Sequence, residues 1–221
     1  MIPAPASIPV QPPARTKPRL RGVSHQVAAV VALIGGVLLV ASTHSRRALL
    51  ATVVYAASLT ALLGISAAYH RRHWPPGPLR WMKRLDHCAI FALIAGTCTP
   101  LCLLALEPAA GARLLWLIWI GAAVGMLRSV FWVSAPKPLS ASLYVVLGWL
   151  VLMEWRGLSE GLGGAGLAWL LGGGVAYTVG AVVYALRRPD PLPTVFGFHE
   201  VFHVFVIAAA ACHFVMVVRL V

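Results

Sequence analysis

Apolar runs of about 20 residues, separated by short polar and basic stretches, make up most of this chain. An α-helix needs roughly that length to cross the hydrocarbon core of a bilayer, so the pattern predicts an all-α integral membrane protein. The fifth run is the shortest and ends at Glu154, next to other polar residues. The pattern predicts a seven-transmembrane helix bundle with spans at about residues 25–43, 48–69, 87–106, 113–133, 140–156, 162–186 and 198–219.

The composition supports this class and leaves no room for a separate soluble domain. Only 11% of the residues are charged and 60% are hydrophobic, whereas a soluble domain averages about 25% and about 45–50%. The first residues are rich in proline and lack a long apolar core, which is typical of a disordered tail. We therefore expect a proline-rich basic tail over residues 1–22 and one seven-helix transmembrane domain over residues 23–221.

The lysines and arginines are divided unequally between the two sides of the expected membrane. Twelve fall in the N-terminal tail and in the alternate loops on its side, and five fall on the other side. Because basic residues concentrate on the cytoplasmic face, the N-terminus is predicted to be cytoplasmic and the C-terminus outside. The net charge of +12 is therefore interpreted as attraction to anionic lipids and not to nucleic acid. Membrane lipids are the expected partners, while no protein partner or oligomeric state is predicted.

Five polar side chains fall at one depth, near the cytoplasmic ends of three spans. Ser66 and His70 lie four residues apart at the end of the second span, so they share a helix face. Asp86 stands at the start of the third span. His199 and His203 lie four residues apart at the start of the seventh. Because polar groups at membrane depth are costly, this convergence indicates a functional site near the cytoplasmic leaflet.

Three imidazoles with an open fourth position are the ligand set of a catalytic zinc site. His70, His199 and His203 are the expected ligands of a Zn²⁺ ion. Asp86 and Ser66 are then expected to hold and deprotonate the bound water. Each residue also has a simpler interpretation, because Asp86 can cap its span and Ser66 can bond back to its own helix. The convergence of all five favours the metal site.

The segment "HEVFH" also matches the H-E-x-x-H motif of zinc proteases. Those enzymes need a third protein ligand further along the chain, and the candidate here, His213, lies about 15 Å deeper on the same helix. The sequence therefore argues against a protease. His213 is a possible pocket residue below the metal, and Glu200 is expected to face a neighbouring helix or the headgroups, although it can still touch the site. His25 is assigned an ordinary role at a helix end.

Three segments carry a resemblance to a known family: "SAAYH", "RLDHCAIFALIAGTCTP" and "FGFHEVFHVFVIAAAACHF". They resemble the signature segments of haemolysin III-type proteins, the bacterial branch of the progestin and adipoQ receptor family. The resemblance runs from about Gly22 to Val221. It implies a seven-helix bundle with a cytoplasmic N-terminus in a bacterial inner membrane. It also implies zinc held by His70, His199 and His203, with Ser66 and Asp86 around the zinc-bound water.

The resemblance leaves the activity open between three classes. Relatives with the same site include ceramide-cleaving amidases, which implies a zinc-dependent hydrolase of lipid amide or ester bonds linked to membrane lipid homeostasis. Receptor-type relatives imply instead a sensor or regulator of membrane state, in which zinc is structural. The haemolysin label implies a channel, although the outer half of the membrane offers few polar side chains for a transport path.

Overall fold

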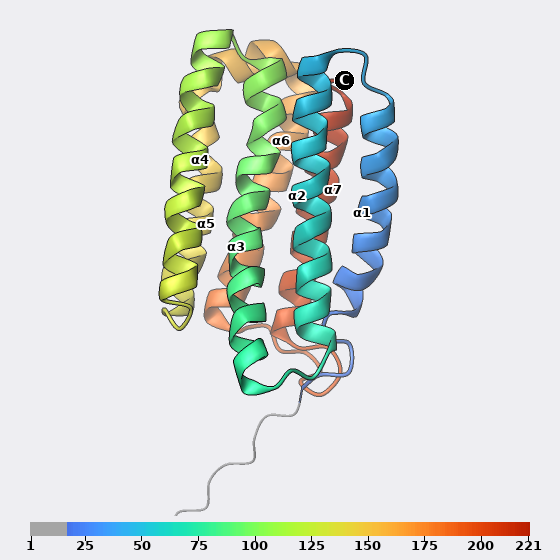
Figure 1. The fold of residues 1–221 in the computed structure, drawn as a ribbon, viewed down its shortest axis with the longest axis vertical. Helices are drawn as coiled ribbons and strands as arrows, with labels where there is room; N and C mark the ends of the chain where they lie inside the picture. Colours follow the sequence, from blue (N-terminus) through green and yellow to red (C-terminus); the bar gives the residue numbers. More distant parts are fainter. Residues whose placement is uncertain (1–16) are drawn as a thin grey trace, which may run out of the picture.

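The computed structural model of this chain describes residues 17–221, which are helical apart from turns and loops (Figure 1). No β-sheet is present within this range. The helices that run along the bundle are joined at several points by short loops. Their bounds are α1 (Val23–Ala41), α2 (Arg46–Arg71), α3 (Pro76–Pro100), α4 (Pro108–Phe131), α5 (Lys137–Trp149), α6 (Trp155–Leu186) and α7 (Phe198–Val218), with a π-helical segment at Leu101–Ala105 and a 3₁₀ segment at Leu150–Glu154.

Six helical stretches of the described residues are long and apolar enough to cross a membrane, which confirms an all-helical membrane architecture. The predicted seven separate spans are not reproduced by this count, because residues Lys137–Leu186 form one stretch of 50 residues. In that stretch α5 has only 13 residues, or about 20 Å of helix, which is less than the roughly 30 Å hydrocarbon core. The 3₁₀ segment then leads into α6 without an intervening loop.

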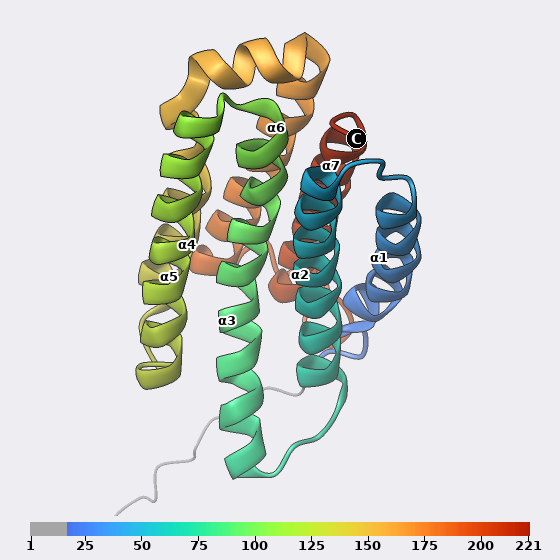
Figure 2. The ribbon, with the colours of Figure 1, turned by 45° about the horizontal axis from the view of Figure 1, so that its top comes forward.

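The long stretch changes direction at the upper end of the bundle. Figure 2 shows that the first part of α6 lies across that end before the helix turns downward. The turn falls at Gly163, whose φ of 62° and ψ of 178° are not helical. Glycine adopts this conformation readily because it has no Cβ. Gly161 lies close to the backbone of Ala105, so the crossing segment packs on the end of the preceding helices.

The apolar side chains fall into a buried core and an exposed belt. Tyr55, Phe91 and Ile118 are at most 1% exposed and occupy the centre of the bundle. By contrast, large apolar side chains on α1 and α4 are open to the surroundings; Phe131, for example, is 82% exposed. Such extended apolar surface is unfavourable in water and suits contact with lipid.

The segment before α1 packs against the loop between α6 and α7. The backbone N–H of Arg19 donates to the carbonyl of Thr194 at 3.0 Å, and that of Leu20 donates to Val195 at 3.1 Å. Residues 1–16 of the predicted 1–22 tail lie outside the described residues. In the described part, residues 17–22 lie against the loop that precedes α7, at the end of the bundle where α2 stops and α7 begins.

A tight contact between α3 and α4 provides a test of how these two helices pack. A Cβ on Gly125 would overlap the buried ring of Phe91, whereas a Cβ on Gly64 in α2 would meet nothing within 4 Å. We expect Gly125→Ala to lower the free energy of unfolding by about 1–3 kcal/mol. Gly64→Ala should change it by less than about 1 kcal/mol, in the stabilising direction. Unfolding of the detergent-solubilised protein measures both, and equal effects would contradict the packing.

Candidate metal centre

Three buried histidines meet at the lower end of the bundle, where α2 ends and α7 begins. His70 lies in the last turn of α2, while His199 and His203 lie in the first two turns of α7. One ring nitrogen from each lies within 4.8 Å of the others. The helical spacing places His199 and His203 on one face of α7, and that face is turned toward α2. The three predicted ligand positions are therefore brought together.

The geometry of this histidine cluster fits a metal ion. The Nε2 atoms of His70 and His199 are 3.0 Å apart, and the imidazole ligands of a tetrahedral zinc ion are about 3.3–3.4 Å apart for metal–nitrogen bonds of about 2.0–2.1 Å. The Nδ1 atom of His203 is buried and has no hydrogen-bond partner among the described residues. Burying an unpartnered ring nitrogen is unfavourable. The three ring nitrogens that lie within 4.8 Å of one another are the donor set of a metal site, so the cluster can hold a metal ion.

A fourth histidine, His25 of α1, belongs to the same cluster although the sequence interpretation assigned it only a helix-end role. Its ring stacks on that of His203 with the centroids 3.7 Å apart and the planes 6° from parallel. Both of its ring nitrogens are buried, and neither makes a hydrogen bond to another of the described residues. The depth of His25 in the membrane could have indicated that it belongs to the cluster, because it lies in the first turn of the first span, level with the other histidines. The stacking itself depends on how α1 packs on α7.

Asp86 and Ser66 line the same cavity as the histidines. Both side chains are buried, and Ser66 is the side chain that interacts with the Asp86 carboxyl group. The alternative that Asp86 caps the third span is wrong, as is its placement in the first helical turn. Helix α3 begins at Pro76, ten residues earlier, because proline is well suited to the first turn of a helix. Asp86 therefore lies on the side of a helix and faces the cavity.

The cavity has a volume of about 380 Å³ and extends well beyond the histidine cluster. Most of its lining side chains are apolar, including Leu62, Ile94 and Val206. His213 lines its far part, where its Nε2 atom lies 3.1 Å from the carbonyl oxygen of Leu170. The cavity therefore joins a polar end at the histidines to a long apolar interior.

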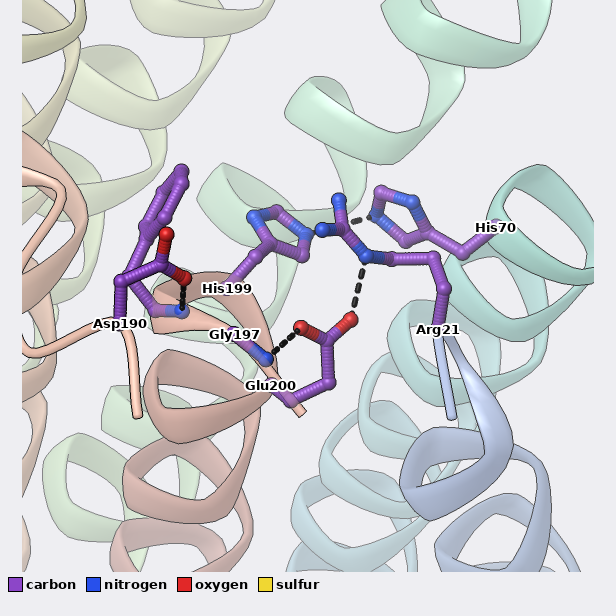
Figure 3. Close-up of polar contacts among 7 residues, drawn as sticks. Arg21, His70, Asp190, Gly197, His199 and Glu200 are labelled. Carbon is purple, nitrogen blue, oxygen red and sulfur yellow. Dashed lines mark hydrogen bonds and ion pairs between the residues drawn. The ribbon is translucent and has the colours of Figure 1, made fainter. Parts of the chain in front are cut away.

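Glu200 does not line this cavity; it binds the segment before α1 instead. Its carboxylate is 1% exposed, and one oxygen forms an ion pair with the Nε of Arg21. The other oxygen accepts a hydrogen bond of 2.8 Å from the backbone N–H of Gly197, which caps the start of α7 (Figure 3). Asp190 adds a second contact by accepting a 2.9 Å hydrogen bond from the N–H of Phe198. Sequence reasoning missed Arg21, because its partner lies 179 residues away.

The chain is similar in sequence to a family model and to several known proteins. A family model described as "Haemolysin-III related" matches residues 14–214. The chain is 34% identical over 195 residues to Hemolysin-3 of Bacillus cereus, covering 87% of this chain and 86% of that protein. It is 29% identical over 169 residues to the adiponectin receptor protein of Drosophila melanogaster, covering 69% and 38%. It is 26% identical over 196 residues to the human monocyte to macrophage differentiation factor, covering 86% and 79%.

Because the ion pair between Arg21 and Glu200 is buried, we expect its loss to lower the free energy of unfolding far more than the loss of an exposed pair. Removing one partner of a buried pair costs about 3–5 kcal/mol, and because the Arg21 side chain is 20% exposed we expect about 2–3 kcal/mol for Arg21→Gln. The pair between Arg113 and Glu154 is the control, since its Arg113 side chain is 70% exposed. Arg113→Gln should cost less than about 0.5 kcal/mol. A loss for Arg21→Gln no larger than that for Arg113→Gln would show that burial does not strengthen the Arg21 pair.

Proposed function

The chain belongs to the haemolysin-III-related family, and on that premise we propose that it is a zinc-dependent hydrolase of lipid amide or ester bonds. Family membership and the apolar helices make it a multi-pass integral membrane protein. The observation that carries the proposal is the composition of one cavity. The same space is lined by the three histidines, by the buried carboxyl group of Asp86 and by a long series of apolar side chains.

The proposed metal ligands are His70, His199 and His203. Zinc is the metal of choice because it binds well to imidazole and accepts three protein nitrogens with one open position. When bound, it supplies Lewis acidity and activation of water, which amide and ester hydrolysis both need. The burial of the three rings keeps bulk water away from these ligands.

The proposed role of Asp86 is proton transfer. Its carboxylate accepts a proton from the attacking water and delivers it to the nitrogen or oxygen of the leaving group. The hydroxyl of Ser66 beside it orients the carboxyl group. The apolar walls, with Leu62 and Val206 among them, hold the acyl chain of the lipid and position its carbonyl group near the histidines.

The proposed topology has seven crossings, with the N-terminus in the cytoplasm and the C-terminus outside, in a bacterial inner membrane. In its support, α1 begins at the lower end of the bundle and the chain ends at the upper end, so the number of crossings is odd (Figure 1). The lower end carries most of the lysines and arginines. Helix α5 and its 3₁₀ extension together have 18 residues, which is close to the length of one crossing.

A second candidate function is a receptor-like sensor of membrane state in which zinc is structural. The observation in its favour is that the cluster connects α2 with α7, while His25 of α1 stacks on it. A metal in that position would hold α2 and α7 together, with α1 packed on them through His25. A relative that carries the name adiponectin receptor protein is consistent with this role.

The ligand assignment predicts how metal content depends on single histidines. His70→Ala and His203→Ala should each abolish stoichiometric zinc binding, because two imidazoles cannot complete the site. His44→Ala, in an exposed loop, should leave metal content unchanged. Elemental analysis of the purified proteins measures all three. A wild-type zinc content retained in both cluster variants would disprove the site, whichever function is correct.

The hydrolase proposal predicts that Asp86→Asn retains zinc but loses activity. The rate of hydrolysis of ceramides and glycerophospholipids should fall by about 10²–10⁴-fold, the usual contribution of a proton-transfer group. Glu160→Gln removes an exposed carboxylate at the other end of the bundle and should leave the rate unchanged. If the zinc-loaded wild type hydrolyses none of these lipids, the hydrolase proposal fails and the structural role of zinc is favoured.

A further inference from the structure

A second pocket of about 290 Å³ lies outside the histidine cluster, at the lower end of the bundle. It is formed by the segment before α1, the end of α2 and the residues that lead into α3. This outer pocket is lined by Lys17, Arg21, Tyr69, His70, Arg72, His73, Trp74 and Leu79. Three of these side chains are cationic at neutral pH. None of the described residues that line the pocket is acidic.

The outer pocket shares a wall with the inner cavity. Arg21, Tyr69 and His70 line both spaces, so these three side chains form the partition between them. Arg21 uses its Nε to bind Glu200. A guanidinium group has five N–H donors in all, and among the described residues no partner of Arg21 other than Glu200 is a carboxylate. The charge of Arg21 is therefore shared between the two spaces and Glu200. Among the described residues, Lys17 and Arg72 are the unpaired cations of the outer pocket.

Arg21 is paired with Glu200, whereas Lys17 and Arg72 have no carboxylate partner among the described residues. The Nζ of Lys17 donates a 3.3 Å hydrogen bond to the backbone carbonyl of Arg72. Partial burial lowers the pKa of Lys17, and the neighbouring charges of Arg21 and Arg71 lower it further. Because the positive charges at this site repel one another and are partly removed from water, binding of an anion stabilises them.

The aromatic and cationic side chains of the pocket are typical of the level of lipid headgroups. The guanidinium of Arg72 lies over the ring of Trp74, 5.5 Å from its centroid. The Nε1 of Trp74 donates a 3.1 Å hydrogen bond to the carbonyl of Ala68, which fixes the ring at the end of α2. Tryptophan and arginine are both enriched where the membrane meets water.

We propose that the outer pocket binds the phosphate group of an anionic lipid headgroup from the adjoining leaflet. Arg72 supplies a planar donor group that matches phosphate oxygens, and Lys17 supplies a compact charge. The acyl chains of such a lipid lie along the exposed apolar surface near Leu79. Inorganic phosphate offers the same chemistry, so the two sources must be separated by experiment. The inference does not depend on hydrolytic activity.

The test uses the full chain in dodecyl maltoside micelles and follows its thermal unfolding. Phosphatidylglycerol, phosphatidylcholine and inorganic phosphate are titrated separately. Phosphatidylglycerol should raise the unfolding midpoint, and its apparent affinity should fall about tenfold in Arg72→Gln and in Lys17→Gln, each of which loses a charge-assisted contact. Arg80→Gln is the matched control, because Arg80 is an exposed arginine near the start of α3 that does not line the pocket. It should retain the wild-type affinity.

Each outcome decides the proposal. Stabilisation by phosphatidylglycerol alone supports a lipid headgroup, while equal stabilisation by inorganic phosphate supports the anion site with free phosphate as its source. Equal effects of phosphatidylglycerol and phosphatidylcholine overturn it, and so do equal losses of affinity in Arg72→Gln and Arg80→Gln. Lys17 is exposed, so Lys17→Gln remains informative if Arg72→Gln does not fold. The zinc content of all variants should equal that of the wild type, which separates this site from the metal centre.

Discussion

The burial of imidazole groups inside an apolar bundle is the constraint on which the rest of this structure depends. Polar groups removed from water are unfavourable unless they find partners. Here His70, His199 and His203 find one another, and His25 covers one face of the group. This requires the end of α2, the start of α7 and the start of α1 to meet at one level, which fixes how the first and last parts of the chain pack together.

At the same end of the bundle, the segment before α1 is bound to the start of α7. Glu200 and Arg21 tie the segment before α1 to the start of α7, next to the histidines (Figure 3). Arg21 also separates the inner cavity from the outer pocket. One arginine thus links the stability of this end with the electrostatics of both spaces.

The H-E-x-x-H segment shows how the same residues change meaning with their surroundings. In a zinc protease its glutamate acts beside the metal. In this chain the glutamate faces away from the cavity and holds a helix start and an arginine, whereas the buried carboxyl group in the cavity comes from Asp86 on α3. The helix spacing fixes the histidine pair in both cases, but the neighbouring helices decide what lies on the other faces.

The sequence by itself determined the helical membrane architecture, because runs of about 20 apolar residues permit little else. It also determined the shared depth of the five polar residues Ser66, His70, Asp86, His199 and His203. Helix geometry also fixed the spacing between His199 and His203 on α7. Only the tertiary structure decided the stacking of His25 on His203, the pairing of Arg21 with Glu200 and the outer pocket. These contacts join residues far apart in the chain. They depend on the rotation and tilt of each helix against its neighbours, which apolar runs do not specify.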